Sequence, residues 1–293
     1  MSIPLEHHRI ITNGIRLHVV IAGPPGGKVV ILLHGFPEFW RGWLKQIEPL
    51  VQAGYRLVVP DQRGYNLSDK PQGVSAYHID TLAQDVIGLM DVVGQEKAVV
   101  IGHDWGAAVA WHLATHYPER VEKLAILNVP HPAIMVQTLR TSLTQLLKSW
   151  YMFFFQLPWL PEWLLGRNNA QGAAELLRRS GKPGTFTYED LAEYRQACTQ
   201  PGALTAMINW YRSSIRSGFG NSLRASRELP RIKVPTLMLW GKQDVALSHE
   251  MAQPSIDLCD DGKLVFFEDA THWLQHDKAD EVNEQLLRFL NPK

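Results

Sequence analysis

Residues 98–111 read AVVIGHDWGAAVAW, and this stretch decides the fold. A β-branched run stops at Gly102, His103 to Trp105 follow, and after Gly106 the chain continues as an alanine-rich segment. We therefore predict a strand, a very tight turn and a helix, with Asp104 at the tip of the turn. Such a turn forces its tip residue into a sparsely allowed backbone conformation, and the positions two before and two after must lack side chains that would clash.

The aspartate at the tip of the turn limits the reactions that the site can catalyse. In the related pattern G-x-S-x-G the tip is a serine, which must lose a proton before it attacks. A carboxylate is already charged at neutral pH, so Asp104 needs no base to attack a saturated carbon. The structural alternative is an aspartate that caps the N-terminus of the following helix. A cap alone does not account for two glycines at symmetric spacing.

Composition excludes several classes of protein. The 293 residues are enough for one large domain with an insertion or for two domains, and 45% of them are hydrophobic. Lys+Arg and Asp+Glu balance at 29 each. The chain therefore lacks the surplus of positive charge that would favour nucleic acid or anionic lipid as a partner. Two cysteines and an N-terminus without the regions of a secretory signal predict a cytoplasmic protein.

Continuous apolar runs predict strands that are buried on both faces, as in a parallel sheet covered by helices. Thr12-Asn13-Gly14 predicts a hairpin that forms an antiparallel edge. Helical periodicity follows Asp80 and recurs near the C-terminus, and this alternation predicts a doubly wound α/β sheet. The predicted strands are 17–22, 29–33, 57–60, 98–101, 124–127, 236–240 and 264–267.

The alternation of strands and helices fails from residue 131 to about 227, where we find helical segments rich in Trp, Phe and Leu. We expect a core domain of residues 1–130 and 227–293, and a helical cap of residues 131–226 over the carboxyl edge of the sheet, where ligands bind in such folds. Within the cap, residues 143–165 are the most apolar stretch of the chain. Lys148, Gln156, two prolines and Glu162 interrupt it, so a membrane span is not predicted.

Reactive side chains follow four of the predicted strands. His34-Gly35-Phe36-Pro37, Asp104, Asp244 and His272 each come shortly after a strand, so the ends of parallel strands bring them to one rim. The last three follow the order nucleophile (Asp104), acid (Asp244) and histidine (His272) along the chain, which is the order of α/β-hydrolases. The motifs HGFPEFW, GHDWG, WGKQDVAL and DATHWLQHD together resemble the epoxide hydrolase family of that superfamily, along nearly the whole chain.

The resemblance implies a role for each residue. Asp104 attacks an epoxide carbon and forms an ester, Tyr151 and Tyr211 of the cap protonate the epoxide oxygen, and His272, oriented by Asp244, activates the water that hydrolyses the ester. The backbone amides of Phe36 and Trp105 form the oxyanion hole, and the Phe36–Pro37 bond is expected to be cis, as in relatives. The partners implied are a small apolar epoxide and water, with no metal, cofactor, nucleic acid or membrane, and with homo-oligomerisation left open. The expected pocket walls are Trp40, Phe153, Phe154 and Trp210.

Each of these roles has a structural alternative. Asp244 is part of a turn-like sequence, and Asp269 is a second candidate acid, although it is too near His272 to come from another strand end. His276 competes with His272, and a pair of histidines at that spacing could bind a metal. His34 and His103 are expected to brace turns. Cap tyrosines often only pack and satisfy a hydrogen bond, and spacing alone does not select Tyr151 and Tyr211 from the four in the cap.

Three other functions compete with epoxide hydrolysis. A haloalkane dehalogenase shares the aspartate nucleophile, but Phe36 offers no side-chain donor for a halide, and no arginine follows Asp104 to hold a fluoroacetate carboxylate. A non-catalytic small-molecule sensor could use the same fold, since fold alone implies no function. A serine esterase is the weakest of the three alternatives, because no serine occupies the tip of the turn. The prediction is a diol-forming hydrolase.

Overall fold

The computed structural model describes residues 3–216 and 231–291 and is built around one eight-stranded sheet. The strand order is β1-β2-β4-β3-β5-β6-β7-β8. Strands β1, β2 and β4 pair antiparallel, and every pairing from β4 through β3 to β8 is parallel. The strands are β1 (Glu6–Thr12), β2 (Ile15–Ala22), β3 (Val29–Leu33), β4 (Arg56–Pro60), β5 (Ala98–His103), β6 (Val121–Leu127), β7 (Thr236–Gly241) and β8 (Gly262–Phe267).

The predicted hairpin forms the antiparallel edge. Asn13 and Gly14 connect β1 to β2 with positive φ angles of 45° and 76°, as two-residue hairpin turns require. At the opposite edge, β8 has a strand neighbour on one side alone, and its residues Leu264 to Phe267 are partly exposed rather than buried on both faces. The α/β class and the positions of the seven predicted strands are confirmed.

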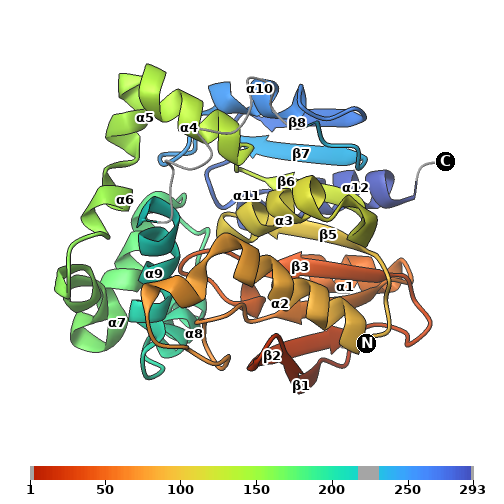
Figure 1. Ribbon diagram of the computed structural model, residues 1–293, viewed down its shortest axis with the longest axis horizontal. Coiled ribbons are helices and arrows are strands. Elements are labelled where there is room, and N and C mark those ends of the chain that lie inside the picture. Colours follow the sequence, from red (N-terminus) through yellow and green to blue (C-terminus); the bar gives the residue numbers. More distant parts are fainter. Residues whose placement is uncertain (1–2, 217–230, 292–293) are drawn as a thin grey trace.

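Helices cover both faces of the sheet (Figure 1). Residues of α2, α3 and α10 belong to one cluster of buried side chains, and residues of α1, α11 and α12 belong to the cluster on the other face. Each cluster contains a fully buried tryptophan, Trp111 on α3 in the first and Trp43 before α1 in the second. These helices are α1 (Leu44–Gln52), α2 (Ile79–Val92), α3 (Trp105–His116), α10 (Ala252–Ile256), α11 (Leu274–Asp277) and α12 (Ala279–Leu290).

A block of helices lies beyond the carboxyl ends of the parallel strands (Figure 1). Within the described residues from His131 to Arg216 the chain forms helices and no strand, which agrees with the cap expected there. Helix α7 is interrupted at residues 167–170, three of which have positive φ. The predicted cap boundary at 226 and 227 lies outside the described residues. The helices are α4 (Pro132–Thr141), α5 (Leu143–Lys148), α6 (Trp150–Phe154), α7 (Leu160–Ser180), α8 (Tyr188–Cys198) and α9 (Ala203–Arg216).

Candidate active site

Asp104 lies at the tip of the turn between β5 and α3, with φ 48° and ψ −125°. This is a conformation that L residues rarely adopt and that persists only where the surroundings enforce it. A Cβ on Gly106 would lie 2.1 Å from the carbonyl oxygen of Leu33, and one on Gly102 would lie 2.5 Å from that of Gly106. The two glycines therefore let β3, β5 and α3 meet. Asp104 occupies the N-cap position of α3, but its side chain makes no capping hydrogen bond, so capping does not account for the aspartate.

Three strand ends bring Asp104, His272 and Asp244 together. Nε2 of His272 lies 3.5 Å from Oδ2 of Asp104, and its Nδ1 lies 2.7 Å from Oδ2 of Asp244. Asp244 also accepts hydrogen bonds from the backbone amides of Ala246 and Leu247, at 2.8 Å and 2.9 Å, so its orientation is fixed. The imidazole is thus held between two carboxylates, with one nitrogen committed to Asp244 and the other facing Asp104.

The charges of this triad stabilise each other. Burial alone would lower the pKa of His272, but the charges and hydrogen bonds of Asp244 and Asp104 raise it to about 10. Burial raises the pKa of each carboxyl group, and the partnership with His272 outweighs this effect, so the pKa values of Asp104 and Asp244 lie below their usual range. At neutral pH the site holds two carboxylates and an imidazolium.

Backbone amides approach the Asp104 carboxylate from the loop after β3. The Phe36 amide donates a hydrogen bond of 2.7 Å to Oδ1 of Asp104, and the Phe36–Pro37 peptide bond is cis. A Cβ on Gly35 would lie 2.2 Å from the same oxygen, so only glycine allows this approach. Trp105 is the first residue of α3, where amides have no acceptor within the helix. Its amide therefore belongs to the positive end of the helix dipole, next to Asp104.

Tyr151 on α6 and Tyr211 on α9 lie together, with ring centroids 5.9 Å apart. The Tyr211 ring is edge-on to Trp105 at 4.9 Å, Phe155 at 4.8 Å and Phe36 at 5.4 Å. Burial, and after it the charge of Asp104, raises the pKa of both tyrosines above the usual range. Both hydroxyls therefore keep their protons at neutral pH and are available as donors near the Asp104 charge.

Arg212, next to Tyr211, connects the two tyrosine-bearing helices. It is buried, and its Nε and Nη2 donate to the carbonyl oxygens of Phe155 and Leu157 at 3.0 Å and 2.6 Å, directly after α6. Its Nη1 lies 2.5 Å from Oε1 of Glu162 at the start of α7. These bonds fix α6 against α9, and hence Tyr151 against Tyr211. Nothing in the sequence indicated this role, because an arginine that follows a tyrosine is not by itself a sign that it holds two helices together.

The predicted pocket walls have mixed outcomes. Trp210 is buried and packs against Trp105, with centroids 5.8 Å apart, and Phe154 packs partly buried on the cluster that includes Tyr211. The structure contradicts the other two assignments. Phe153 is 53% exposed, because it lies on the outer side of α6. Trp40 packs edge-on against His7 at 5.5 Å and belongs to the cluster on the other face of the sheet, so it is a core residue.

Phe155 and Asn128 are functional candidates that the sequence analysis missed. Phe155 is 2% exposed and contacts the rings of Tyr151, Tyr211 and Phe36, one position beyond the two phenylalanines that were chosen. Asn128 follows β6 with φ 55°, and its Nδ2 donates to Oδ2 of Asp244 at 2.9 Å. An asparagine directly after a strand is a signal that could have found it, because asparagine tolerates this conformation.

His276 has a different partner from His272. Its Nε2 lies 2.7 Å from Oε1 of the fully buried Glu38, which also accepts a hydrogen bond from the hydroxyl of Tyr194 at 2.8 Å. His103 joins this network through Nδ1, 3.2 Å from Oε2 of Glu38, and its Nε2 lies 2.9 Å from the carbonyl oxygen of His272. This cluster braces the turn that precedes Asp104, as expected for His103. It contacts the triad through the backbone of His272, but its carboxylate is Glu38 and not Asp244.

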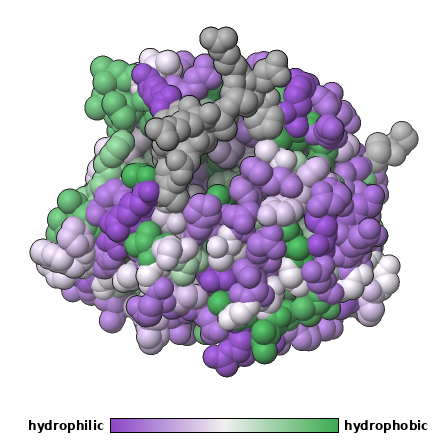
Figure 2. Space-filling view, in the orientation of Figure 1, coloured by the Kyte–Doolittle hydropathy of each residue, from purple (hydrophilic) through white to green (hydrophobic). Residues whose placement is uncertain are grey.

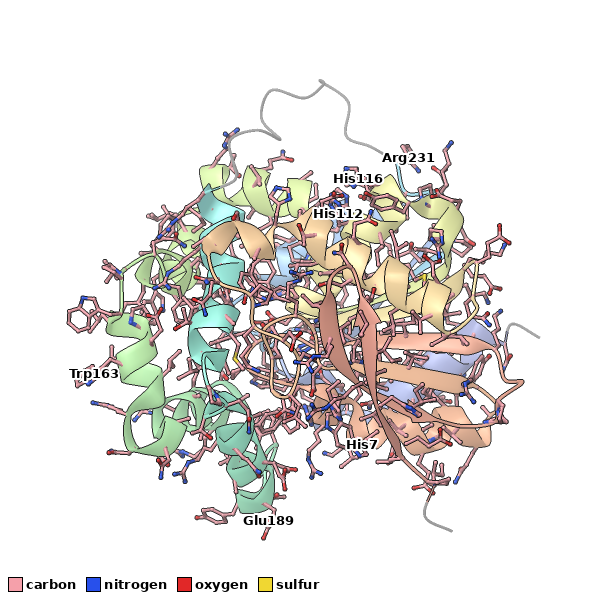
Figure 3. The ribbon with its side chains drawn as sticks, turned by 60° about the horizontal axis from the view of Figure 1, so that its bottom comes forward. His7, His112, His116, Trp163, Glu189 and Arg231 are labelled. Atoms are coloured by element: carbon pink, nitrogen blue, oxygen red, sulfur yellow. The ribbon has the colours of Figure 1, made fainter. Side chains whose placement is uncertain are left out.

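The remaining competing residues lie away from Asp104 or brace the loops around it. Asp269 is exposed and pairs with Lys278 at 2.9 Å, so it is not the acid beside His272. His34 braces the loop after β3, because its Nδ1 lies 3.0 Å from the Gly35 carbonyl oxygen. His112 and His116 stack on α3 with centroids 4.1 Å apart (Figure 3). Among the described residues, no group of three or more His, Cys, Asp or Glu side chains is arranged to hold a metal ion.

Comparison with known proteins places this arrangement in a class. Residues 28–165 match the family model of the alpha/beta hydrolase fold. The AB hydrolase superfamily protein YfhM of Bacillus subtilis is 49% identical over 280 residues, which make up 95% of this chain and 96% of that protein. The chain therefore belongs to the α/β-hydrolase superfamily.

Further relatives define the branch of that superfamily. Epoxide hydrolase 4 of Homo sapiens is 38% identical over 96% of this chain and 77% of that protein. A crystal structure of an epoxide hydrolase from Bacillus megaterium, in complex with an inhibitor, superposes with a TM-score of 0.88 at 33% identity and covers 97% of this chain and 100% of that one. Within the superfamily, the chain belongs to the epoxide hydrolase family, as the motifs predicted.

Proposed function

We propose that this protein hydrolyses small apolar epoxides to vicinal diols through a covalent ester on Asp104. The observation that carries the proposal is one constellation. An ionised aspartate at a strained turn faces His272 and lies close to the buried Tyr211 and the partly buried Tyr151, both of which keep their protons. The names of the relatives, several of which are epoxide hydrolases, support the same reaction.

The first step opens the epoxide ring. Oδ1 of Asp104 is held by the Phe36 amide, so Oδ2 is the oxygen that attacks an epoxide carbon as the carbon–oxygen bond breaks. The departing oxygen takes a proton from Tyr151 or Tyr211, because an unprotonated alkoxide would be heavily penalised in an apolar site. The products of this step are a hydroxyalkyl ester and a tyrosinate.

Formation of the ester changes the state of His272. The Asp104 charge, which helps to raise the pKa of His272 to about 10, disappears when the ester forms. The pKa of the imidazole then falls, and the proton it releases restores the tyrosine hydroxyl. His272 is now neutral and acts as a general base toward water, a contribution of about 10² to 10⁴ in rate.

The second step regenerates the enzyme. Water gives a proton to His272 and attacks the carboxyl carbon of the ester, and the Phe36 and Trp105 amides bind the oxyanion that develops on the former Oδ1. When this intermediate collapses, the ester bond breaks, the remaining proton of the added water passes to the departing alkoxide to give the diol, and Asp104 returns as a carboxylate beside the imidazolium. The cycle consumes one epoxide and one water, and it uses no metal or redox cofactor.

The organisation of the chain is part of the proposal. We assign residues 1–130 and 227–293 to the hydrolase core and residues 131–226 to the cap, with the tyrosines supplied by the cap. A cytoplasmic location and homo-oligomerisation stay predictions from the sequence. Among the described residues, no helix combines the length and the apolar character needed to cross a bilayer.

One experiment separates the candidate functions. Purified protein is given styrene oxide or a bromoalkane, and diol and bromide are measured, with Asp104→Ala as the control. We expect diol formation without bromide release, and no diol above background from Asp104→Ala. Bromide without diol would assign a haloalkane dehalogenase, since a halide needs donors but no proton. Tight binding of epoxides or diols without turnover would assign a sensor.

A further inference from the structure

The apolar stretch of the cap that was singled out in the sequence has one exposed side. Eight of the fourteen exposed large hydrophobic side chains among the described residues fall between positions 143 and 163, on α5, α6, the connection after α6 and the start of α7. Trp159 is 70% exposed and Leu143 71%. We call this set the apolar stripe, and it consists of Leu143, Leu146, Leu147, Trp150, Phe153, Leu157, Trp159 and Trp163.

The same elements have an inner side that belongs to the site. Phe155 is buried and packs against both candidate tyrosines, whereas Trp150 and Phe153 of the neighbouring helix point outward. Figure 2 shows hydrophobic side chains gathered along the edge of the molecule formed by these helices, and Trp163 lies at the outer edge of the cap (Figure 3). The stripe is therefore not part of the core of the cap. Exposed apolar surface of this extent marks an interaction site.

The exposed charged side chains of residues 140–169, the stretch that carries the apolar stripe, are positive. From Arg140 to Asn169 the sequence contains one carboxylate, Glu162, and this group is neutralised by Arg212. Arg140 and Arg167 are exposed, and the Arg167 guanidinium lies 5.8 Å from the centroid of the Trp163 ring. A partner of this surface must therefore offer apolar contact and negative charge.

We propose that the apolar stripe docks on the surface of a lipid bilayer that contains anionic headgroups. Tryptophans favour the level of the headgroups, leucine and phenylalanine reach the acyl boundary, and arginines at the rim contact anionic lipid. This is a peripheral association, which differs from the membrane span that the prolines and charges of this stretch exclude. It departs from the expectation of no membrane partner, which rested on net charge and spanning length alone, and it does not depend on the proposed reaction.

A second copy of the chain fits the apolar stripe less well. A two-fold symmetric dimer places the same patch of both copies face to face. It would bring the Arg140 and Arg167 side chains of both copies into one interface, and this part of the chain has no unpaired carboxylate to neutralise them. A lipid surface supplies the missing negative charge.

Vesicle co-sedimentation of the full-length protein tests the proposal. The vesicles contain phosphatidylcholine alone or phosphatidylcholine with phosphatidylglycerol. We expect binding to the mixed vesicles, about tenfold weaker for Trp150→Glu/Trp163→Glu, because the substitution removes apolar contact and adds repulsion. Arg140→Gln/Arg167→Gln should lose the preference for the anionic vesicles. The matched control is Ile11→Glu/Tyr188→Glu, which changes two side chains outside the stripe that are more exposed than Trp150 and Trp163, and it should bind as the unmodified protein does.

Three outcomes overturn the proposal. The first is that the unmodified protein stays in the supernatant with both kinds of vesicle. The second is that the stripe variant and the matched control bind equally. The third is that light scattering shows a dimer which Trp150→Glu/Trp163→Glu converts to a monomer, without vesicle binding, and this result assigns the apolar stripe to a second copy. Circular dichroism and the unfolding midpoint check that each variant is folded, which we expect because the changed side chains are exposed.

Discussion

The two halves of the candidate site are held in place by different means. In the core, Asp104, Asp244 and His272 follow strands, and the sheet fixes where their backbones lie. In the cap, Tyr151 and Tyr211 are on helices whose relative position depends on side chains, above all on Arg212 and Phe155. The comparison teaches that the backbone geometry of the sheet fixes the positions of the nucleophile and the base, whereas side-chain packing fixes the positions of the two tyrosine acids.

The largest effect is expected in the core half. Asp244→Asn keeps the shape of the side chain but removes the negative charge that orients His272 and raises its pKa. By analogy with catalytic triads, we expect turnover to fall about 10⁴-fold, with the ester accumulating. The matched control is Asp269→Asn, which changes an exposed carboxylate three residues from His272. Steady-state diol formation should be unchanged in the control, and equal losses in both variants would show that Asp244 has no special role.

The next effect tests the cap half. Tyr151→Phe/Tyr211→Phe removes both hydroxyls and keeps both rings, so the packing with Phe155 and Trp105 is retained. We expect ring opening to slow by about 10² to 10³ or more, the loss typical of one such donor, while hydrolysis of the ester already formed is unaffected. Single-turnover mass spectrometry separates the two steps. Tyr188→Phe, at a tyrosine that is 90% exposed, serves as the control. Unaltered ring opening in the double variant would remove the tyrosines from the mechanism.

A smaller effect distinguishes positioning from stability. Arg212→Met leaves the partly buried Glu162 unpaired and should lower the free energy of unfolding by about 3 kcal/mol. Adding Glu162→Gln should restore much of this stability. In both variants we expect the ring-opening rate to be about tenfold below that of the unmodified protein, because the carbonyl oxygens of Phe155 and Leu157 no longer have their hydrogen bonds from Arg212. Denaturant unfolding and single-turnover rates measure the two quantities. If the rate recovers together with stability, Arg212 has a structural role alone.

The smallest effect compares two neighbouring phenylalanines of the cap. Phe155→Ala removes a ring that packs against both Tyr211 and Phe36, so we expect a loss of several-fold in the ring-opening rate as Tyr211 gains freedom, together with about 3 kcal/mol of stability. Phe153→Ala changes an exposed side chain of the apolar stripe and should alter neither quantity. Parallel rate and unfolding measurements on both variants decide the point, and a larger loss from Phe153→Ala would restore it as a pocket wall.

The same division explains how far the sequence could be interpreted. The strands and the turn at Asp104 were predictable, because buried parallel strands are continuous apolar runs and because Gly102 and Gly106 are required by contacts that no other residue permits. The triad order followed from that topology. Trp40 and Phe153 were misplaced, since an aromatic residue in a helix or loop has no sequence mark for the side it faces. Phe155 and Arg212 were missed for the same reason.

The central claim is that Asp104 becomes covalently bound to substrate and that His272 acts only in its release. Intact-mass spectrometry of His272→Gln after addition of styrene oxide tests this claim most directly. We predict that the protein gains the mass of one styrene oxide, that the adduct maps to the peptide containing Asp104, and that Asp104→Ala/His272→Gln gains none. Full turnover by His272→Gln with no adduct, or an adduct that persists when Asp104 is replaced, would contradict the account.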